Sequence, residues 1–142
     1  MNLNYSKKGY NKLINILEEY GFPYNDTLIE IFYQFGGLEI NNFNFYFKNN
    51  NNEIIKDSIN YVLSFNRKNS KTIVEVMDKL VGKIEGEFYP FAISENGNCI
   101  GIYLSEFEEE IIQVYIEEED TLYRIIDENE KDLLLIDFLN GF

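Results

Sequence analysis

The sequence predicts a single α+β domain over residues 1–142, built from an antiparallel sheet with flanking helices. Three observations support this class. The spacing of apolar residues changes along the chain from helical to alternating and back, and turn residues separate the alternating stretches. Of the 142 residues, 45% are hydrophobic and 16% aromatic, so this acidic chain carries enough apolar surface for a core.

Two amphipathic helices are expected first. In residues 6–20 apolar side chains recur at helical spacing, and Gly21 is placed to end the helix in a left-handed conformation. Asn25 or Asp26 is expected to cap the second helix, and the glycines at 36–37 to stop it. The side chains expected to face the core are Tyr10, Leu13, Ile14, Leu17, Leu28, Ile31, Phe32 and Phe35.

Alternation of apolar and polar residues then predicts strands. The first covers residues 38–47 and ends at an asparagine-rich turn, 49–52. Residues 53–65 also fit a strand, whereas residues 70–81 return to a helical stripe.

The second half is expected to complete the sheet. In the strand 87–93, Pro90 cannot donate a ladder hydrogen bond, which places it at an edge or a bulge. After a tight turn at 96–97, residues 100–116 predict a β-hairpin, and residues 121–126 one more strand. A closing helix up to Gly141 is expected, capped by Asp127 or Asn129. Its expected core residues are Leu133, Leu134, Ile136 and Leu139.

Negative charge is concentrated in the second half of the chain. Residues 72–142 hold 18 acidic and four basic residues, whereas residues 1–71 hold seven and eight. Eight of the acids lie within residues 106–120, with no basic residue among them. Like charges this dense repel one another, so the surface is either simply solvated or complementary to a strongly basic partner. Such a field attracts basic proteins and repels nucleic acid and anionic membranes.

The residues that most enzymes and metal sites use are scarce. The chain has no histidine and a single cysteine, Cys99, which is expected to be a small buried residue in a strand. Residues 82–83 lack the upstream glycine of a phosphate loop, and Lys131 occupies a ligand position in the calcium-loop-like segment 127–132. We therefore expect no catalytic residue, metal or cofactor. No apolar run approaches the length that crosses a bilayer, so a cytoplasmic protein is expected.

Short motifs recur in a distinctive order: FGGL at residues 35–38, FYPFA at 88–92, ENGN at 95–98, and a closing helix over 133–141. This order resembles the SUKH superfamily, and its third group most closely. Two departures are that FA replaces the usual Ile-Gly pair and that the chain has no tryptophan.

The resemblance implies a non-enzymatic α+β module that binds proteins. Bacterial members of the superfamily are mostly immunity proteins, encoded beside polymorphic toxins of nuclease or deaminase type, which they neutralise by direct binding. Eukaryotic relatives regulate cell-wall assembly or act as scaffolds. The implied partner is a basic protein toxin, because a toxin that holds a phosphate backbone needs a basic active site. We expect a monomer or weak dimer.

The candidate partner-binding residues lie on the predicted hairpin and its two acidic ends. Tyr115 and Tyr103 lie on the hairpin face opposite the aliphatic residues, so they are interface anchors if that face is exposed and core residues if it is covered. Glu53 and Asp57, in the nearly neutral half, are expected to lie outside the interface. The candidates are Glu106, Glu108, Glu109, Glu110, Tyr115, Glu117, Glu118, Glu119 and Asp120.

Three functions remain open at this point. The first is an immunity protein, and the second is a regulatory scaffold without a toxin; gene neighbourhood separates them. The third is a carboxylate-dependent hydrolase, which needs a concave site with two carboxylates roughly 5–10 Å apart, one of them in an apolar wall.

Overall fold

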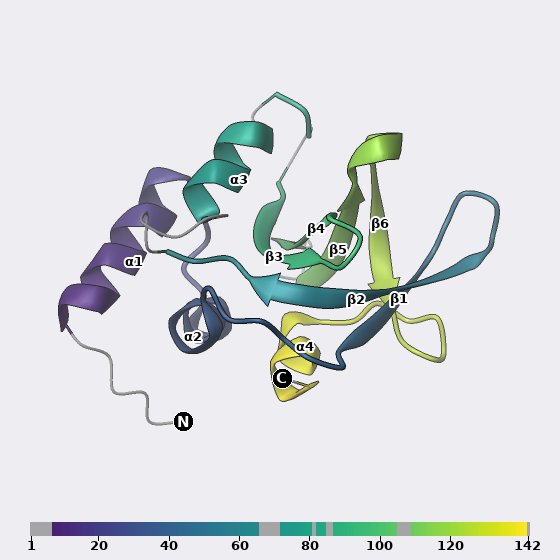
Figure 1. Cartoon of the computed structure of the whole chain (residues 1–142), viewed down its shortest axis with the longest axis horizontal. Coiled ribbons are helices and arrows are strands. Elements are labelled where there is room, and N and C mark those ends of the chain that lie inside the picture. Colours follow the sequence, from purple (N-terminus) through teal and green to yellow (C-terminus); the bar gives the residue numbers. More distant parts are fainter. Residues whose placement is uncertain (1–6, 66–71, 81, 85–86, 105–108, 142) are drawn as a thin grey trace.

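The computed structural model describes residues 7–65, 72–80, 82–84, 87–104 and 109–141 (Figure 1). Helices and strands are mixed along the chain, as the predicted α+β class requires. In chain order the elements are α1 (Lys7–Glu19), α2 (Asp26–Phe35), β1 (Asn44–Lys48), β2 (Ile54–Val62), α3 (Ile73–Leu80), β3 (Tyr89–Ser94), β4 (Cys99–Leu104), β5 (Glu110–Ile116), the 3-10 helix η1 (Glu117–Glu119), β6 (Thr121–Ile126) and α4 (Leu135–Gly141).

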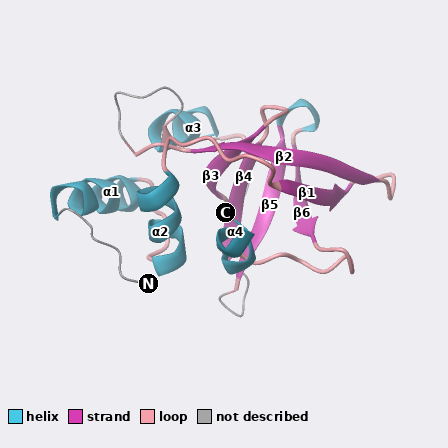
Figure 2. Ribbon diagram, turned by 60° about the horizontal axis from the view of Figure 1, so that its bottom comes forward, coloured by secondary structure: helices cyan, strands magenta, loops and turns pink. Residues whose placement is uncertain are grey.

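The six strands form a closed antiparallel barrel, in which each strand pairs with its neighbours in the chain and β1 pairs with β6. The expected open sheet with flanking helices is therefore wrong. Closure depends on a short contact that places Tyr46 opposite Ile126 and Phe47 opposite Ile125. It removes both exposed edges that an open sheet would leave. Figure 2 shows α1 and α2 gathered beside the barrel.

The helix α4 fills one end of the barrel. Phe138 is fully buried there, with its ring centroid 4.8 Å from that of Phe43 and 6.1 Å from that of Phe91. Leu134 pairs with Ile111 at the start of β5, whereas η1 follows the end of β5. The end that carries η1 is therefore opposite the end that α4 fills.

The two N-terminal helices match their predicted signals. Gly21 has a φ of 74° directly after α1, as its position predicts. Of the two candidate caps, Asn25 is the cap of α2, and its side-chain oxygen accepts the N–H of Leu28 at 2.9 Å. Gly37 follows α2 with a φ of 81°, and its N–H donates to the carbonyl of Val62 at 2.8 Å, which joins the end of α2 to β2.

The first predicted strand is too long at its start. β1 begins only at Asn44, because Asn42 adopts a φ of 61° that a continuous strand does not allow. Leu38, placed at the start of the predicted strand, precedes β1 and is 54% exposed. The stretch 53–65, which also fitted a strand, contains β2. Pro90 lies at a register shift of the β3–β4 ladder, as the bulge alternative predicted.

The predicted start of the last helix is wrong, and of its predicted core residues Ile136 is exposed, whereas Leu133 and Leu139 pack against the core. Asp127 caps a tight turn, because its Oδ1 accepts the backbone N–H groups of Asn129 and Lys131 at 2.8 and 2.9 Å. Residues 132–134 then run extended and pair with β6 and β5, which delays the helix to Leu135. Its buried side chains are Leu135 and Phe138, while Ile136 is exposed and Leu133 and Leu134 precede it. No helix among the described residues is long and apolar enough to cross a membrane.

Candidate functional site

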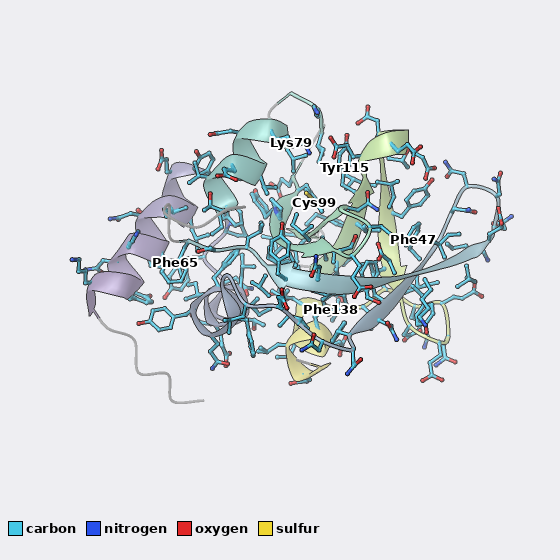
Figure 3. The ribbon with its side chains drawn as sticks, viewed as in Figure 1. Phe47, Phe65, Lys79, Cys99, Tyr115 and Phe138 are labelled. Carbon is cyan, nitrogen blue, oxygen red and sulfur yellow. The ribbon has the colours of Figure 1, made fainter. Side chains whose placement is uncertain are left out.

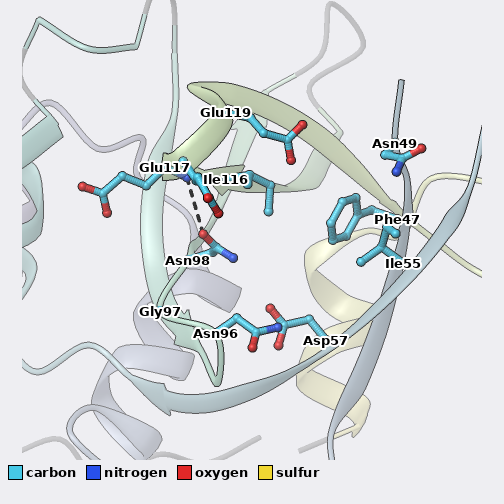
Figure 4. Close-up of a pocket in the computed structure, with 11 residues that line it drawn as sticks. Phe47, Asn49, Ile55, Asp57, Asn96, Gly97, Asn98, Ile116, Glu117 and Glu119 are labelled. Carbon is cyan, nitrogen blue, oxygen red and sulfur yellow. Dashed lines mark hydrogen bonds between the residues drawn. The ribbon is translucent and has the colours of Figure 1, made fainter. Parts of the chain in front are cut away.

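Three chain connections meet at the end of the barrel opposite α4: the β1–β2 turn, the β3–β4 turn and η1. In an antiparallel barrel every second connection lies at the same end, so the topology brings them together. They surround a cavity of about 690 Å³ (Figure 4). We call this cavity the barrel mouth, and its lining is Phe47, Asn49, Ile55, Asp57, residues 96–98 and residues 116–119.

One wall of the barrel mouth is apolar. Phe47 on β1 lies opposite Ile55 on β2 in the strand register, so both side chains point to the same face of the sheet. Phe47 and Ile116 are buried, and Ile55 is half-buried. The Phe47 ring stacks on Tyr123 with a centroid distance of 5.1 Å, which fixes its position. The wall is therefore preformed by side chains of the barrel itself.

Asp57 places a carboxylate in this wall. It lies two residues after Ile55 and opposite Phe45, so it points to the inward face of β2. Only 6% of its surface is exposed. Its Oδ1 accepts the backbone N–H of Ser58 at 2.7 Å, and in the described part of the chain it makes no other hydrogen bond and no ion pair.

Of the two residues expected to lie outside the interface, Asp57 lines the mouth and Glu53 does not. The signal for Asp57 was present in the sequence. The spacing of Ile55, Asp57 and Ile59 puts a charged residue in the apolar phase of a strand, where charged residues are rare unless paired.

The rim of the mouth is acidic. Glu117 Oε2 lies 2.9 Å from Lys79 Nζ, and Lys83 approaches its other oxygen to 4.0 Å, so α3 is tied to η1 (Figure 3). The hydrogen bond from Lys79 lowers the pKa of Glu117 below its ordinary value. Glu119 accepts the hydroxyl of Tyr123 at 2.7 Å. Glu118 is exposed and has no hydrogen bond or ion pair among the described residues, so its charge is directed to solvent.

Tyr115 belongs to the core. It is 3% exposed, and its hydroxyl donates a hydrogen bond to the Asp120 carboxylate, which raises the pKa of Tyr115 to about 12. The prediction of Tyr115 as a partner-contacting anchor is therefore wrong, and the covered-face alternative applies. Its role is to hold Asp120, which takes a left-handed φ of 50° as the chain turns into β6. Tyr103 is half-buried, with the Arg124 guanidinium 5.7 Å from its ring centroid.

The two acidic ends of the hairpin do not form one surface. Glu110 begins β5 and Glu117 follows its last residue, and an extended strand of this length separates them by about 20 Å. Glu110 is also engaged, because it accepts a hydrogen bond from the side chain of Asn25 at the start of α2. Glu109 is exposed, and Glu106 and Glu108 lie outside the described residues. Of the predicted acids that the structure describes, only those at 117–120 lie at or beside the mouth.

The described residues contain no group of three or more acidic or cysteine side chains placed to hold a metal ion. Cys99, the single cysteine of the chain, is half-buried at the start of β4 and packs against the core. Comparisons with known protein families, curated proteins and solved structures found no match to the chain.

Proposed function

We infer that the protein is a non-enzymatic binding module whose acidic barrel mouth docks on a basic protein. Within this class, the function we favour is bacterial immunity: neutralising a cognate polymorphic toxin of nuclease or deaminase type by covering its active site. The observation that carries the proposal is the barrel mouth itself, which is lined by the carboxylates of Asp57, Glu117, Glu118 and Glu119 and, within the part of the chain that the structure describes, by no basic residue.

Charge supports this choice of partner. The net charge of the chain is −13, and the acids at 117–120 lie on a protruding connection where a large partner can reach them. A protein surface that binds a phosphate backbone is rich in lysine and arginine. An acidic module therefore attracts such a surface over several ångströms and competes with its substrate for the same cations.

The SUKH-like motif order is the second support, and it narrows the class to immunity proteins and scaffolds. The motifs themselves have structural reasons in this fold. The glycines at 36–37 join α2 to β2, and Phe91 packs against Phe138 inside the barrel. They are therefore expected to maintain the fold while the barrel mouth binds the partner.

The test is co-purification with the toxin-like C-terminal domain encoded by the adjacent gene, together with growth of cells that express that domain. An immunity protein forms a stable complex and restores growth. Absence of a complex at low ionic strength contradicts the proposal. If the adjacent gene encodes no toxin and growth is not restored, the scaffold alternative takes its place.

A carboxylate-dependent hydrolase is the second candidate, because the cavity holds the buried Asp57 within the same concave site as the carboxylates of η1. Lys79 lowers the pKa of Glu117, so Glu117 does not suit the role of general acid, and another carboxylate of the mouth would have to supply the proton. Hydrolysis of chromogenic glycosides that is lost in Asp57→Asn would favour the hydrolase over the binder.

A further inference from the structure

Asp57 is the feature of the mouth that packing does not explain. It occupies an inward position of a barrel strand, between Ile55 and Ile59 in the spacing of that face. An aliphatic residue would suit this place, because buried acids are rare unless a cation or several donors pair with them. Here one oxygen has a single backbone donor, Ser58, and the other has no donor in the described part of the chain.

The open oxygen belongs to a residue that lines the cavity (Figure 4). The charged groups around it are all acceptors, namely the carboxylates of Glu117, Glu118 and Glu119, whereas the asparagines of the lining offer both an amide oxygen and an NH₂ group. Phe47, Ile55 and Ile116 supply apolar surface beside them. The site therefore suits a group that carries several donors at the end of an aliphatic stem.

We propose that the barrel mouth is the receptor for one arginine side chain of the basic partner protein, a step that rests on the proposed function. The methylene stem packs against the apolar wall, and the guanidinium donates hydrogen bonds to the carboxylate of Asp57. Arginine suits this site better than lysine, because the guanidinium has five donors in a plane and is more weakly hydrated than an ammonium group. The rim acids at 117–119 raise the local concentration of the cation.

The test uses the whole protein and three capped tripeptide amides, Gly-Arg-Gly, Gly-Lys-Gly and Gly-citrulline-Gly, followed by the NMR shifts of backbone amides. Citrulline keeps the shape of arginine and removes its charge. We expect saturable shifts at Gly97, Asn98 and Ile116 with the arginine peptide, and at least about tenfold weaker binding of the citrulline peptide. Equal binding of the arginine and citrulline peptides, or shifts outside the mouth, overturns the proposal without any variant.

Asp57→Asn removes the charge and keeps the size of the side chain. We expect it to weaken the arginine peptide at least about tenfold, the order of loss when one partner of a hydrogen-bonded charge pair is removed. Glu53→Gln is the matched control, because Glu53 is exposed at the end of the β1–β2 turn, directly before β2, and does not line the mouth. An equal loss of affinity for the arginine peptide in both variants would show that only the overall negative charge matters, and it would overturn the specific pairing with Asp57.

Other occupants give different results. Tighter binding of Ca²⁺ or Mg²⁺ than of the arginine peptide, with displacement of the peptide, makes the mouth a metal site and overturns the proposal. Micromolar binding of spermidine, together with no binding of the arginine peptide, makes the mouth a small-amine site and also overturns the proposal. If the adjacent toxin domain fails to bind while the arginine peptide still occupies the mouth, the proposed function fails and the receptor stands. If the toxin binds and Asp57→Asn leaves the affinity of that complex unchanged, the proposed arginine receptor is wrong and the proposed function is supported.

Discussion

Replacing Gly36 or Gly37 by alanine should destabilise the fold through two different mechanisms. A Cβ at Gly36 would lie 2.4 Å from the carbonyl oxygen of Phe32 and 3.3 Å from that of Leu63, so the backbone must move. That movement disturbs the Gly36 N–H to Phe32 bond of 3.0 Å and the adjacent Gly37 N–H to Val62 bond of 2.8 Å. At about 1 kcal/mol for each hydrogen bond, plus strain, we expect a loss of about 2–4 kcal/mol.

Gly37→Ala should cost less, about 1–2 kcal/mol, because alanine is strained in the left-handed conformation that Gly37 adopts with a φ of 81°. Gly37→Asn should cost less again, since asparagine tolerates that conformation, whereas Gly36→Asn should be no milder than Gly36→Ala. Gly21→Ala is the control for conformational cost alone, because Gly21 has a φ of 74° and no atom lies within 4 Å of its added Cβ.

Urea unfolding followed by circular dichroism measures these costs. With a slope of about 2 kcal/mol/M, the Gly36→Ala midpoint should fall by about 1–2 M. A Gly36→Ala midpoint no lower than that of Gly21→Ala would refute the steric argument. An unchanged midpoint in Gly37→Ala would show that the left-handed conformation carries no cost there.

Three further predictions follow from the packing and the side-chain chemistry. The folded state holds the pKa of Tyr115 at about 12, above the ordinary value of 10.0, so the free energy of unfolding should fall as pH rises between these values. Tyr115→Phe should make this fall smaller. It should not abolish the fall, because burial also raises the pKa of Tyr61 to about 12. Urea unfolding at pH 9 and 11 measures the fall, and an equal loss of unfolding free energy in the wild type and in Tyr115→Phe would contradict the prediction. Phe138→Ala should cost about 3–5 kcal/mol by emptying the α4 end of the barrel, while the exposed Ile136→Ala should stay within about 0.5 kcal/mol. The purified protein should be a monomer or weak dimer without a stoichiometric transition metal, and one tightly held metal per chain in elemental analysis would contradict this.

Local patterns predicted most elements because their causes are local. The asparagine cap of α2, the stop at residues 36–37 and the pairing of Ile100 with Val114 each depend on neighbours in the chain. Barrel closure depends on Phe47 meeting Ile125, which are far apart in sequence, and no local period reports it. The late start of α4 has the same cause, since residues 132–134 are captured by strands that only the folded barrel brings near.

The site was predicted in part. Charge density indicated Glu117, Glu118 and Glu119, which line the mouth. It also indicated Glu110, which instead accepts a hydrogen bond from Asn25 at the start of α2. Composition alone cannot separate these ends, because the length of β5 places them at opposite ends of the barrel. Asp57 was missed because it lies in the nearly neutral half of the chain. Its position in the alternating pattern of Ile55 and Ile59, which places it on the inward face of the strand, was given less weight than charge.

The association rate with the basic partner is the most direct test of the acidic barrel mouth as the binding site. It should fall as salt rises, since the Debye length shrinks from about 10 Å at 0.1 M to about 3 Å at 1 M. The structure selects Glu118→Lys/Glu119→Lys as the reversal, because Glu117 is paired with Lys79. At low salt this variant should associate at least about tenfold more slowly.

Glu18→Lys is the control, because Glu18 is exposed on α1, which Figure 1 shows on the far side of α3 from the barrel. Stopped-flow association at several salt concentrations, for the wild type and both variants, is the measurement. A rate that falls with salt and with the double reversal, and changes less than about twofold in Glu18→Lys, is the predicted result. Tight binding with a rate indifferent to salt and to the reversal would show that the acids at the mouth are only solvated and that the partner binds elsewhere.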